Sequence, residues 1–177
     1  ESNRNHFLLA LNFDKSKLLA AWLDLTTGEF QIAEEKNPDN LMPVFTSIDP
    51  REIITPEFGR QEWYKYDEIH LWLEQFDRFC DGRPLSEVPD FYFDRDSGRQ
   101  TVADALGVLN LGGFGIHEDH PALGSAGALV CYATENLCAK PKNLEKIKEY
   151  RSSSSLLLDP ATIRNLEIFK SAQNTQK

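Results

Sequence analysis

The chain has 177 residues, and its 28 acidic against 19 basic residues give a formal net charge of −9. This length favours one domain of ordinary size, with room for a short piece of another. Duplex DNA carries about one negative charge per 1.7 Å, so an acidic chain is expected to bind it poorly by itself. There is no run of about 20 apolar residues and no secretion-signal pattern, which predicts a cytoplasmic protein with no membrane span.

Three cysteines, Cys80, Cys131 and Cys138, occur without a Cys-x-x-Cys spacing. An odd number at these spacings favours reduced thiols in the core over a disulfide or a zinc site. Acidic residues concentrate between positions 67 and 96, where nine of them accompany three basic ones. We interpret this stretch as a solvated acidic surface, with a basic protein partner as the alternative.

Short apolar stretches separated by polar turns open the chain, at residues 7–13, 18–25 and 29–34. They predict three strands joined as a meander. The second stretch is apolar almost throughout, as expected for a strand covered on both faces.

A helix and two more strands are expected next. The helix follows from apolar residues at helical spacing, namely Leu41, Val44, Phe45 and Ile48. Residues 51–55 then predict a fourth strand, and a helix between strands implies a crossover to a parallel neighbour. One or two helices are expected within 57–79, and residues 90–93 are the candidate fifth strand.

The last third is predicted to be helical. One helix has Asp96 or Ser97 as its candidate cap and includes Val102, Leu106 and Leu109. After a glycine-rich turn, a second helix is expected over 122–139, and its many small residues let another element approach closely. Together these elements predict an α/β domain with a mixed five-stranded sheet and flanking helices.

Two clusters of polar residues are candidates for catalytic or metal sites. Carboxylates near strand ends suggest a metal-dependent nuclease, with Asp14, Asp24, Glu29 and Asp94 or Asp96 as ligands, but most of them flank turns where solvated acids are ordinary. The His117–His120 run has two imidazoles but no third histidine or paired cysteine, and a polar loop that caps the next helix explains it better. No serine, cysteine or histidine has a plausible catalytic base nearby.

The segment at 156–169 carries a strong helix start, because Asp159 accepts bonds from free amides and Pro160 suits the first helical position. Ile163, Leu166 and Phe169 behind it form an apolar stripe that needs a partner. We therefore expect this chain to be a piece of a larger protein.

Five segments in order resemble the MutS family of DNA mismatch-repair proteins. They are WLDLTTGEF (22–30), DPREIITPEF (49–58), GGFGI (112–116), AGALVCYATENL (126–137) and LLLDPATIRNLEIF (156–169). The first four are similar to the MutS connector domain, and the last is similar to the start of its long-helix core, or lever, domain. The Phe-x-Glu mismatch-reading motif and the ATPase phosphate loop of the family are absent from this sequence.

The resemblance implies a ribonuclease-H-like connector at residues 1–150, followed at 151–177 by a hinge and the first lever helix. The strand and helix order predicted above is compatible with that fold. The connector joins mismatch recognition to the ATPase and offers a face to MutL. Residues 62–90 depart from the family pattern, because they are longer and more acidic than expected.

The resemblance also implies particular residues and partners. The MutL-facing positions fall on Arg99, Gln100, Thr101 and Asp104. The hinge and lever junction falls on Asp159, Thr162, Arg164, Asn165, Leu166 and Glu167. No enzyme activity and no cofactor are expected of this chain, since ATP and magnesium belong to the full-length protein. The expected partners are a MutL-type protein and the rest of the MutS chain, with mismatched DNA bound only by the full-length protein and this piece monomeric. A stand-alone ribonuclease-H-like nuclease is the alternative.

Overall fold

The computed structural model describes residues 5–138, 141 and 143–152 of the chain. Most of the predicted connector is therefore described, whereas the predicted hinge and lever segment is described only at Arg151 and Ser152. The six predicted junction residues, from Asp159 to Glu167, lie outside the described residues. The division at residue 150 stays a prediction.

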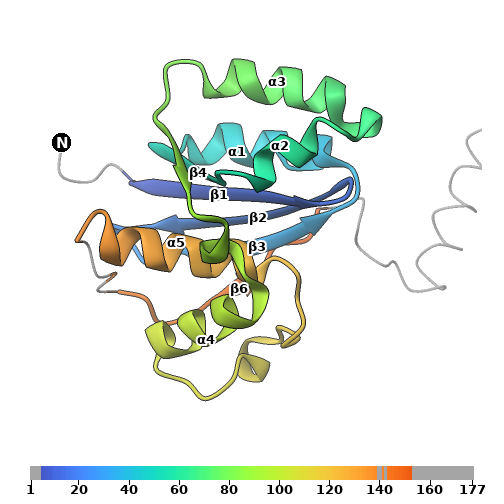
Figure 1. Ribbon diagram of the computed structural model, residues 1–177. Helices are drawn as coiled ribbons and strands as arrows, with labels where there is room; N and C mark the ends of the chain where they lie inside the picture. The colour runs from blue at the N-terminus through green and yellow to red at the C-terminus, as the bar shows by residue number, and fades with distance from the viewer. Residues whose placement is uncertain (1–4, 139–140, 142, 153–177) are drawn as a thin grey trace, which may run out of the picture.

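A mixed six-stranded sheet forms the middle layer of the domain (Figure 1). Its strands are β1 (Phe7–Asp14), β2 (Lys17–Asp24), β3 (Phe30–Glu35), β4 (Glu52–Pro56), β5 (Leu85–Val88) and β6 (Lys148–Glu149). They lie in the order β5-β4-β1-β2-β3-β6. The first three form an antiparallel meander, β4 is parallel to β1, β5 to β4, and β6 to β3.

Helices cover both faces of this sheet (Figure 1). They are α1 (Met42–Ile48), α2 (Gly59–Trp63) and α3 (His70–Cys80) on one face, and α4 (Arg95–Leu106) and α5 (Leu123–Glu135) on the other. Short 3₁₀ turns occur at Pro38–Asn40, Asp67–Ile69, Asp90–Phe93 and Gly112–Phe114. A meander whose first strand is extended in parallel by β4 and β5 is the ribonuclease-H-like arrangement. The predicted fold class is confirmed.

Strand β2 shows why the sequence folds into three layers. Its alternate residues enter two different cores: Leu19 and Leu23 pack beneath α5, and Leu18 and Trp22 pack beneath α1 and α3. All of these side chains are buried, so the strand is covered on both faces as predicted. A strand with two apolar faces requires a layer of helices on each side.

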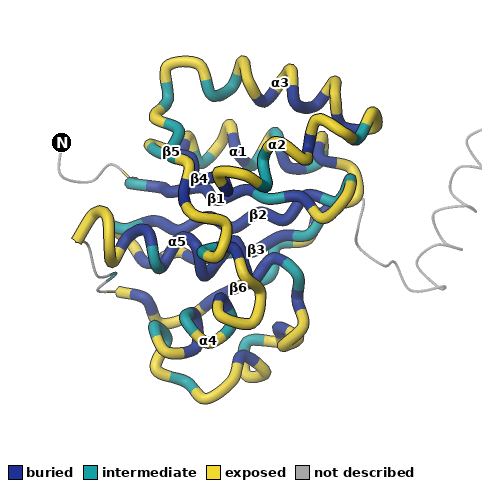
Figure 2. The backbone as a smooth tube through the Cα atoms, in the orientation of Figure 1, coloured by how far each residue is buried: buried dark blue, intermediate teal, exposed yellow. Residues whose placement is uncertain are grey.

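Helix α5 is buried over most of its length between the sheet and α4 (Figure 2). Its glycines make this contact close, because a Cβ added at Gly127 would lie 2.3 Å from the Cα of Gly98 in α4. A Cβ added at Gly124 would lie 2.1 Å from the carbonyl oxygen of Phe93. The predicted close approach of another element to these small residues is confirmed.

The fifth strand was predicted wrongly. Residues 90–93 form a 3₁₀ turn, and Leu85–Val88 is the strand that pairs with β4. Ser86 and Glu87 interrupt its apolar pattern, so only its backbone pairing with β4 identifies it as a strand. The sheet also has six strands instead of five, because β6 adds two residues at the edge beside β3.

Three helix boundaries also differ from expectation. Asp94, two residues before the first of the predicted caps, caps α4 by accepting a hydrogen bond from the Ser97 amide at 2.9 Å. Gly107 ends α4 in the left-handed conformation, at φ 69°, which leaves Leu109 outside the helix and 99% exposed. Helix α5 ends at Glu135 instead of reaching residue 139.

The three cysteines are unpaired, as predicted. Cys80 and Cys131 are half-buried, but Cys138 is exposed beyond the end of α5, so the expectation of core thiols is wrong for it. Burial raises the pKa of Cys80 to about 11 and also raises the pKa of Cys131, which keeps both thiols protonated near neutral pH.

Candidate functional site

The five carboxylates that are candidate nuclease ligands do not all come together. Asp14 lies at the β1–β2 hairpin opposite Lys17, whereas Asp24 lies at the other end of β2 opposite Phe7. Asp14, Asp94 and Asp96 line one pocket of about 290 Å³, but Asp24 is at the opposite end of β2, and Glu29 is beside it in the turn before β3. Within the described ranges, no group of three His, Cys, Asp or Glu side chains is placed to hold a metal ion.

Asp24 instead organises the turn between β2 and β3. Its buried carboxylate accepts hydrogen bonds from the His6 amide at 3.0 Å, the Thr26 amide at 2.9 Å and the Thr27 hydroxyl at 2.9 Å. Burial by itself would raise the pKa of Asp24, but these hydrogen bonds outweigh it and the pKa is lowered. The carboxylate is therefore a structural anion that fixes the turn.

The prediction that the His117–His120 loop caps the next helix is wrong, because no side chain caps α5 and the loop only leads into its N-cap residue, Ala122. The Nδ1 atom of His120 accepts a hydrogen bond from the Ala122 amide at 3.1 Å. The ring proton is thereby placed on Nε2, which lies 3.3 Å from Oε1 of Glu149 in β6. His120 is buried, so this pair ties the α5 side of the domain to the edge strand.

Residues 148–152, called here the exit segment, are built into that edge of the sheet. Lys148 and Glu149 pair with β3, and the Tyr150 amide donates to the Ile32 carbonyl at 2.7 Å. The Tyr150 ring meets the buried Trp22 ring edge to face, with centroids 5.6 Å apart.

The last described residue of the exit segment is also fixed. The Ser152 hydroxyl donates to Oε1 of Glu35 at 2.7 Å, and both residues are buried. The other oxygen of Glu35 accepts from Asn40 at 3.3 Å. The chain is thus held to the sheet up to residue 152, and no sequence pattern indicated this, because two paired residues carry no periodicity.

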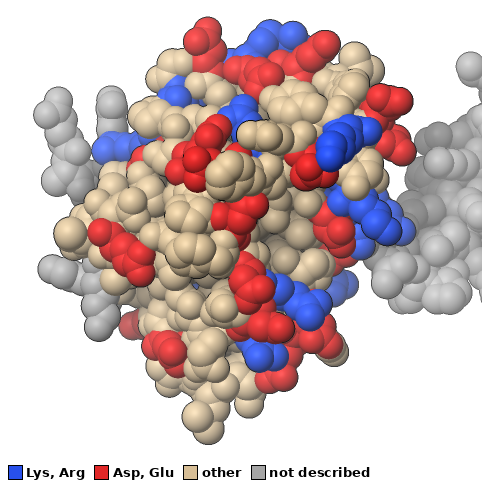
Figure 3. Space-filling model, in the orientation of Figure 1, with Lys and Arg blue, Asp and Glu red and all other residues tan. Residues whose placement is uncertain are grey.

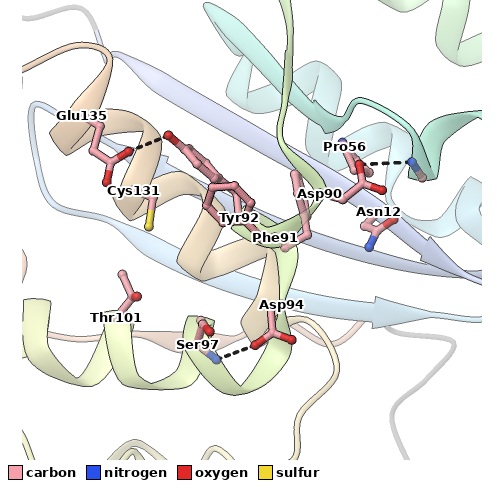
Figure 4. A pocket seen from close by; sticks show the side chains of 13 residues that line it. Asn12, Pro56, Asp90, Phe91, Tyr92, Asp94, Ser97, Thr101, Cys131 and Glu135 are labelled. Carbon is pink, nitrogen blue, oxygen red and sulfur yellow. Dashed lines mark hydrogen bonds between the residues drawn. The ribbon is translucent and has the colours of Figure 1, made fainter.

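The four predicted MutL-facing residues lie on α4, but not on one uniform face. Gln100 and Asp104 are exposed and adjacent, with Nε2 of Gln100 donating to Oδ1 of Asp104 at 2.8 Å. Thr101 is half-buried and turns into a pocket shared with Cys131 (Figure 4). Arg99 is half-buried. Gln100, Asp104 and Thr101 therefore border one surface that continues into the pocket.

That pocket has a volume of about 570 Å³. It opens between the carboxyl ends of β1 and β4, the 3₁₀ turn at Asp90–Phe93, and helices α4 and α5 (Figure 4). Crevices outside the carboxyl ends of parallel strands are common ligand sites in α/β folds. Sequence reasoning missed it, although the aromatic run after Pro89 was the available signal.

Comparisons with known proteins give the family. The family model described as MutS domain II matches residues 6–148. The DNA mismatch repair protein MutS of Protochlamydia amoebophila (strain UWE25) is 30% identical over 170 residues, which cover 96% of this chain. That of Roseiflexus sp. (strain RS-1) is 28% identical over 206 residues, which cover 99% of this chain. The chain therefore belongs to the MutS domain II family, and the resemblance is confirmed.

The chain spans 19% of the length of each of these two relatives. Among solved structures, T. thermophilus RuvC in complex with Holliday junction substrate is similar with a TM-score of 0.46 and 12% identity, covering 72% of this chain and 94% of that one. Among the described residues, no helix has the length and apolar character needed to cross a membrane.

Proposed function

We propose that this domain is the connector of a MutS-type mismatch-repair ATPase, and that it transmits conformational change between mismatch recognition and the ATPase end. The observation that carries the proposal is the exit segment, which is bonded to β3, Trp22 and Glu35 up to residue 152. If the part of the protein that follows residue 152 moves, the exit segment transmits that movement to the whole sheet. A loose linker would absorb the movement. Rigid elements of this kind carry coupling between distant sites.

The coupling is tested in the full-length protein with the double variant Tyr150→Ala, Ser152→Ala. Both changes loosen the exit segment while leaving α4 and the pocket untouched. We expect unchanged affinity for mismatched DNA and unchanged basal ATP hydrolysis, but about 5–20-fold slower ATP-dependent release from a mismatch, in the range of ordinary allosteric couplings. Stopped-flow release of labelled DNA measures this rate.

The matched control is Tyr64→Ala, Ser47→Ala, which removes the same two side-chain types at exposed positions outside the exit segment, α4 and the pocket. Release at the wild-type rate is expected for the control. If the exit-segment variant also releases mismatched DNA at the wild-type rate, the coupling proposal is contradicted.

A second role is docking of a MutL-type protein on the exposed surface of α4. It is supported by the exposed Gln100–Asp104 pair and by the family positions that fall on this helix. No catalysis is assigned to the chain itself, and ATP and magnesium are expected to be bound by other parts of the full-length, cytoplasmic protein. The same holds for mismatched DNA, and the chain itself is expected to be monomeric.

Docking is tested by Gln100→Arg, which replaces the hydrogen bond to Asp104 by an ion pair and places a bulky cation on the surface. We expect binding of a MutL-type N-terminal domain to weaken by about fivefold or more, since one central interface residue contributes about 1 kcal/mol or more. Biolayer interferometry measures the dissociation constant. Gln61→Arg, an exposed position on α2 across the sheet, is the control and should bind as the wild type does.

A further inference from the structure

The pocket beside α4 has a lining of one charge sign. Three carboxylates, those of Asp90, Asp94 and Glu135, lie on its walls, and no Lys, Arg or His lines it. None of the three forms an ion pair with another described residue. Asp and Glu side chains run through the middle of the face on which the pocket opens (Figure 3). A cation entering it meets attraction from three sides.

The carboxylates are held in place, and each keeps an oxygen for a ligand. Oδ1 of Asp90 accepts from the Phe58 amide at 2.9 Å, and Oδ2 of Asp94 accepts from the Ser97 amide. Oε2 of Glu135 accepts from the Tyr92 hydroxyl at 2.6 Å. The second oxygen of each carboxylate is not used in these bonds. Fixed acceptors bind a cation without first having to be ordered.

Aromatic side chains lie beside these carboxylates in the pocket. Phe91 is 72% exposed at the pocket, although a large apolar side chain gains from being covered. It contacts the Tyr92 ring edge to face, with centroids 5.2 Å apart, and both rings lie between Glu135 and Asp90 (Figure 4). Aromatic faces beside carboxylates favour a flat cation with weak hydration.

We propose that this pocket is a docking site for an arginine side chain on a segment of a partner protein. A guanidinium stacks on aromatic rings and pairs with carboxylates in a planar geometry, and it is desolvated more easily than a lysine ammonium. The segment lies along the surface bordered by Thr101, which leads from α4 into the pocket. Recognition of the arginine is a property of the pocket and does not require a particular partner protein. It is therefore a separate proposal from the docking of a MutL-type protein on α4.

The test uses the 177-residue chain and a synthetic seven-residue peptide. The peptide has a central arginine with a leucine on each side, and its remaining residues are glycine and serine. Two further peptides replace the arginine by citrulline, which is uncharged, or by lysine. Titrations followed by ¹H–¹⁵N spectra should give a dissociation constant of about 1 mM or tighter for the arginine peptide, with shifts at the amides of Tyr92, Thr101 and Cys131. Citrulline should abolish the shifts, and lysine should bind about fivefold more weakly.

Two variants locate the binding on the protein. Phe91→Ser and Glu135→Gln should each weaken the arginine peptide by about fivefold, and Gln at position 135 keeps an acceptor for the Tyr92 hydroxyl. Leu109→Ser, at a fully exposed leucine, and Glu118→Gln, at an exposed loop glutamate, are the matched controls. No binding of the arginine peptide, equal binding of the citrulline or lysine peptide, or equal loss in the controls would overturn the proposal. The titration involves no MutL-type protein. Its outcome is therefore independent of whether a MutL-type protein docks on α4.

Discussion

Gly127→Ala is expected to lower the free energy of unfolding by about 2–4 kcal/mol. Alanine is the better helix former by about 1 kcal/mol, so an isolated helix would gain from the change. In the folded domain the new methyl carbon would lie 2.3 Å from the Cα of Gly98, and this neighbour is backbone that has no rotamer to change. The helices α4 and α5 must separate, and overpacking of this kind outweighs the helix propensity.

Urea unfolding followed by circular dichroism measures this change. Gly113→Ala is the matched control, because a Cβ added there meets no atom within 4 Å. We expect the control to lie within about 0.5 kcal/mol of the wild type. A neutral or stabilising Gly127→Ala would mean that α4 and α5 are not in the close contact described above.

Removing the Asp24 side chain is expected to have the second largest effect. Asp24→Ala leaves the His6 and Thr26 amides and the Thr27 hydroxyl without their acceptor and should cost about 2–4 kcal/mol at pH 7. Asp24→Asn keeps one oxygen for the two amides and should cost about 1–2 kcal/mol, because only the charge and one bond are lost. Asp119→Ala and Asp119→Asn, at an exposed loop position, are the controls for both changes.

The Asn variant also predicts a pH dependence with a definite sign. The pKa of Asp24 is lowered in the folded state from its ordinary value of 3.8, so its ionisation stabilises the fold above pH 3.8. That contribution disappears as the pH falls below 3.8 and through the lowered pKa of the folded state. The difference between wild type and Asp24→Asn should therefore be constant from pH 7 to pH 5 and shrink below pH 4. A difference that grows on acidification would contradict the assigned role.

Much of the central sheet was predictable because its signals are local. The meander of β1 to β3 follows from three apolar stretches and two turns. The helix before β4 predicts that β4 has a parallel neighbour, and the structure identifies that neighbour as β1. The small residues of α5 also indicated close packing before any contact was known. Each of these signals reflects physical constraints within a short stretch of chain.

The strands β5 and β6 were not predictable for the opposite reason. Ser86 and Glu87 interrupt the apolar pattern of β5, and their backbone is recruited by the edge of β4. Only two residues of β6 pair with β3. Glu149 is held by His120, and the residues that follow β6 are held by Trp22 and Glu35, all from distant parts of the chain. Edge pairing is decided by the completed sheet, which a local pattern does not contain.

One part of the candidate site was predictable from the sequence and another part was not. The α4 positions were obtained by resemblance, and the structure brings Gln100, Thr101 and Asp104 to one surface. The pocket forms only because the turn at Asp90–Phe93 contacts Glu135 of α5, which is more than 40 residues away in the sequence. A local sequence pattern does not contain such a contact. Exposed Phe91 was read as part of a strand, because a run of aromatic residues is more typical of a strand than of a pocket wall.

The most direct measurement is hydrogen exchange of the Tyr150 amide in the 177-residue chain. This amide donates to Ile32 of β3 at 2.7 Å, and the coupling proposal requires the exit segment to move as part of the sheet. We predict that its opening free energy lies within about 1 kcal/mol of that of the β3 amides bonded to β2, as for amides in one cooperative unit. Exchange at the rate of an exposed loop, while those β3 amides stay protected, would contradict it.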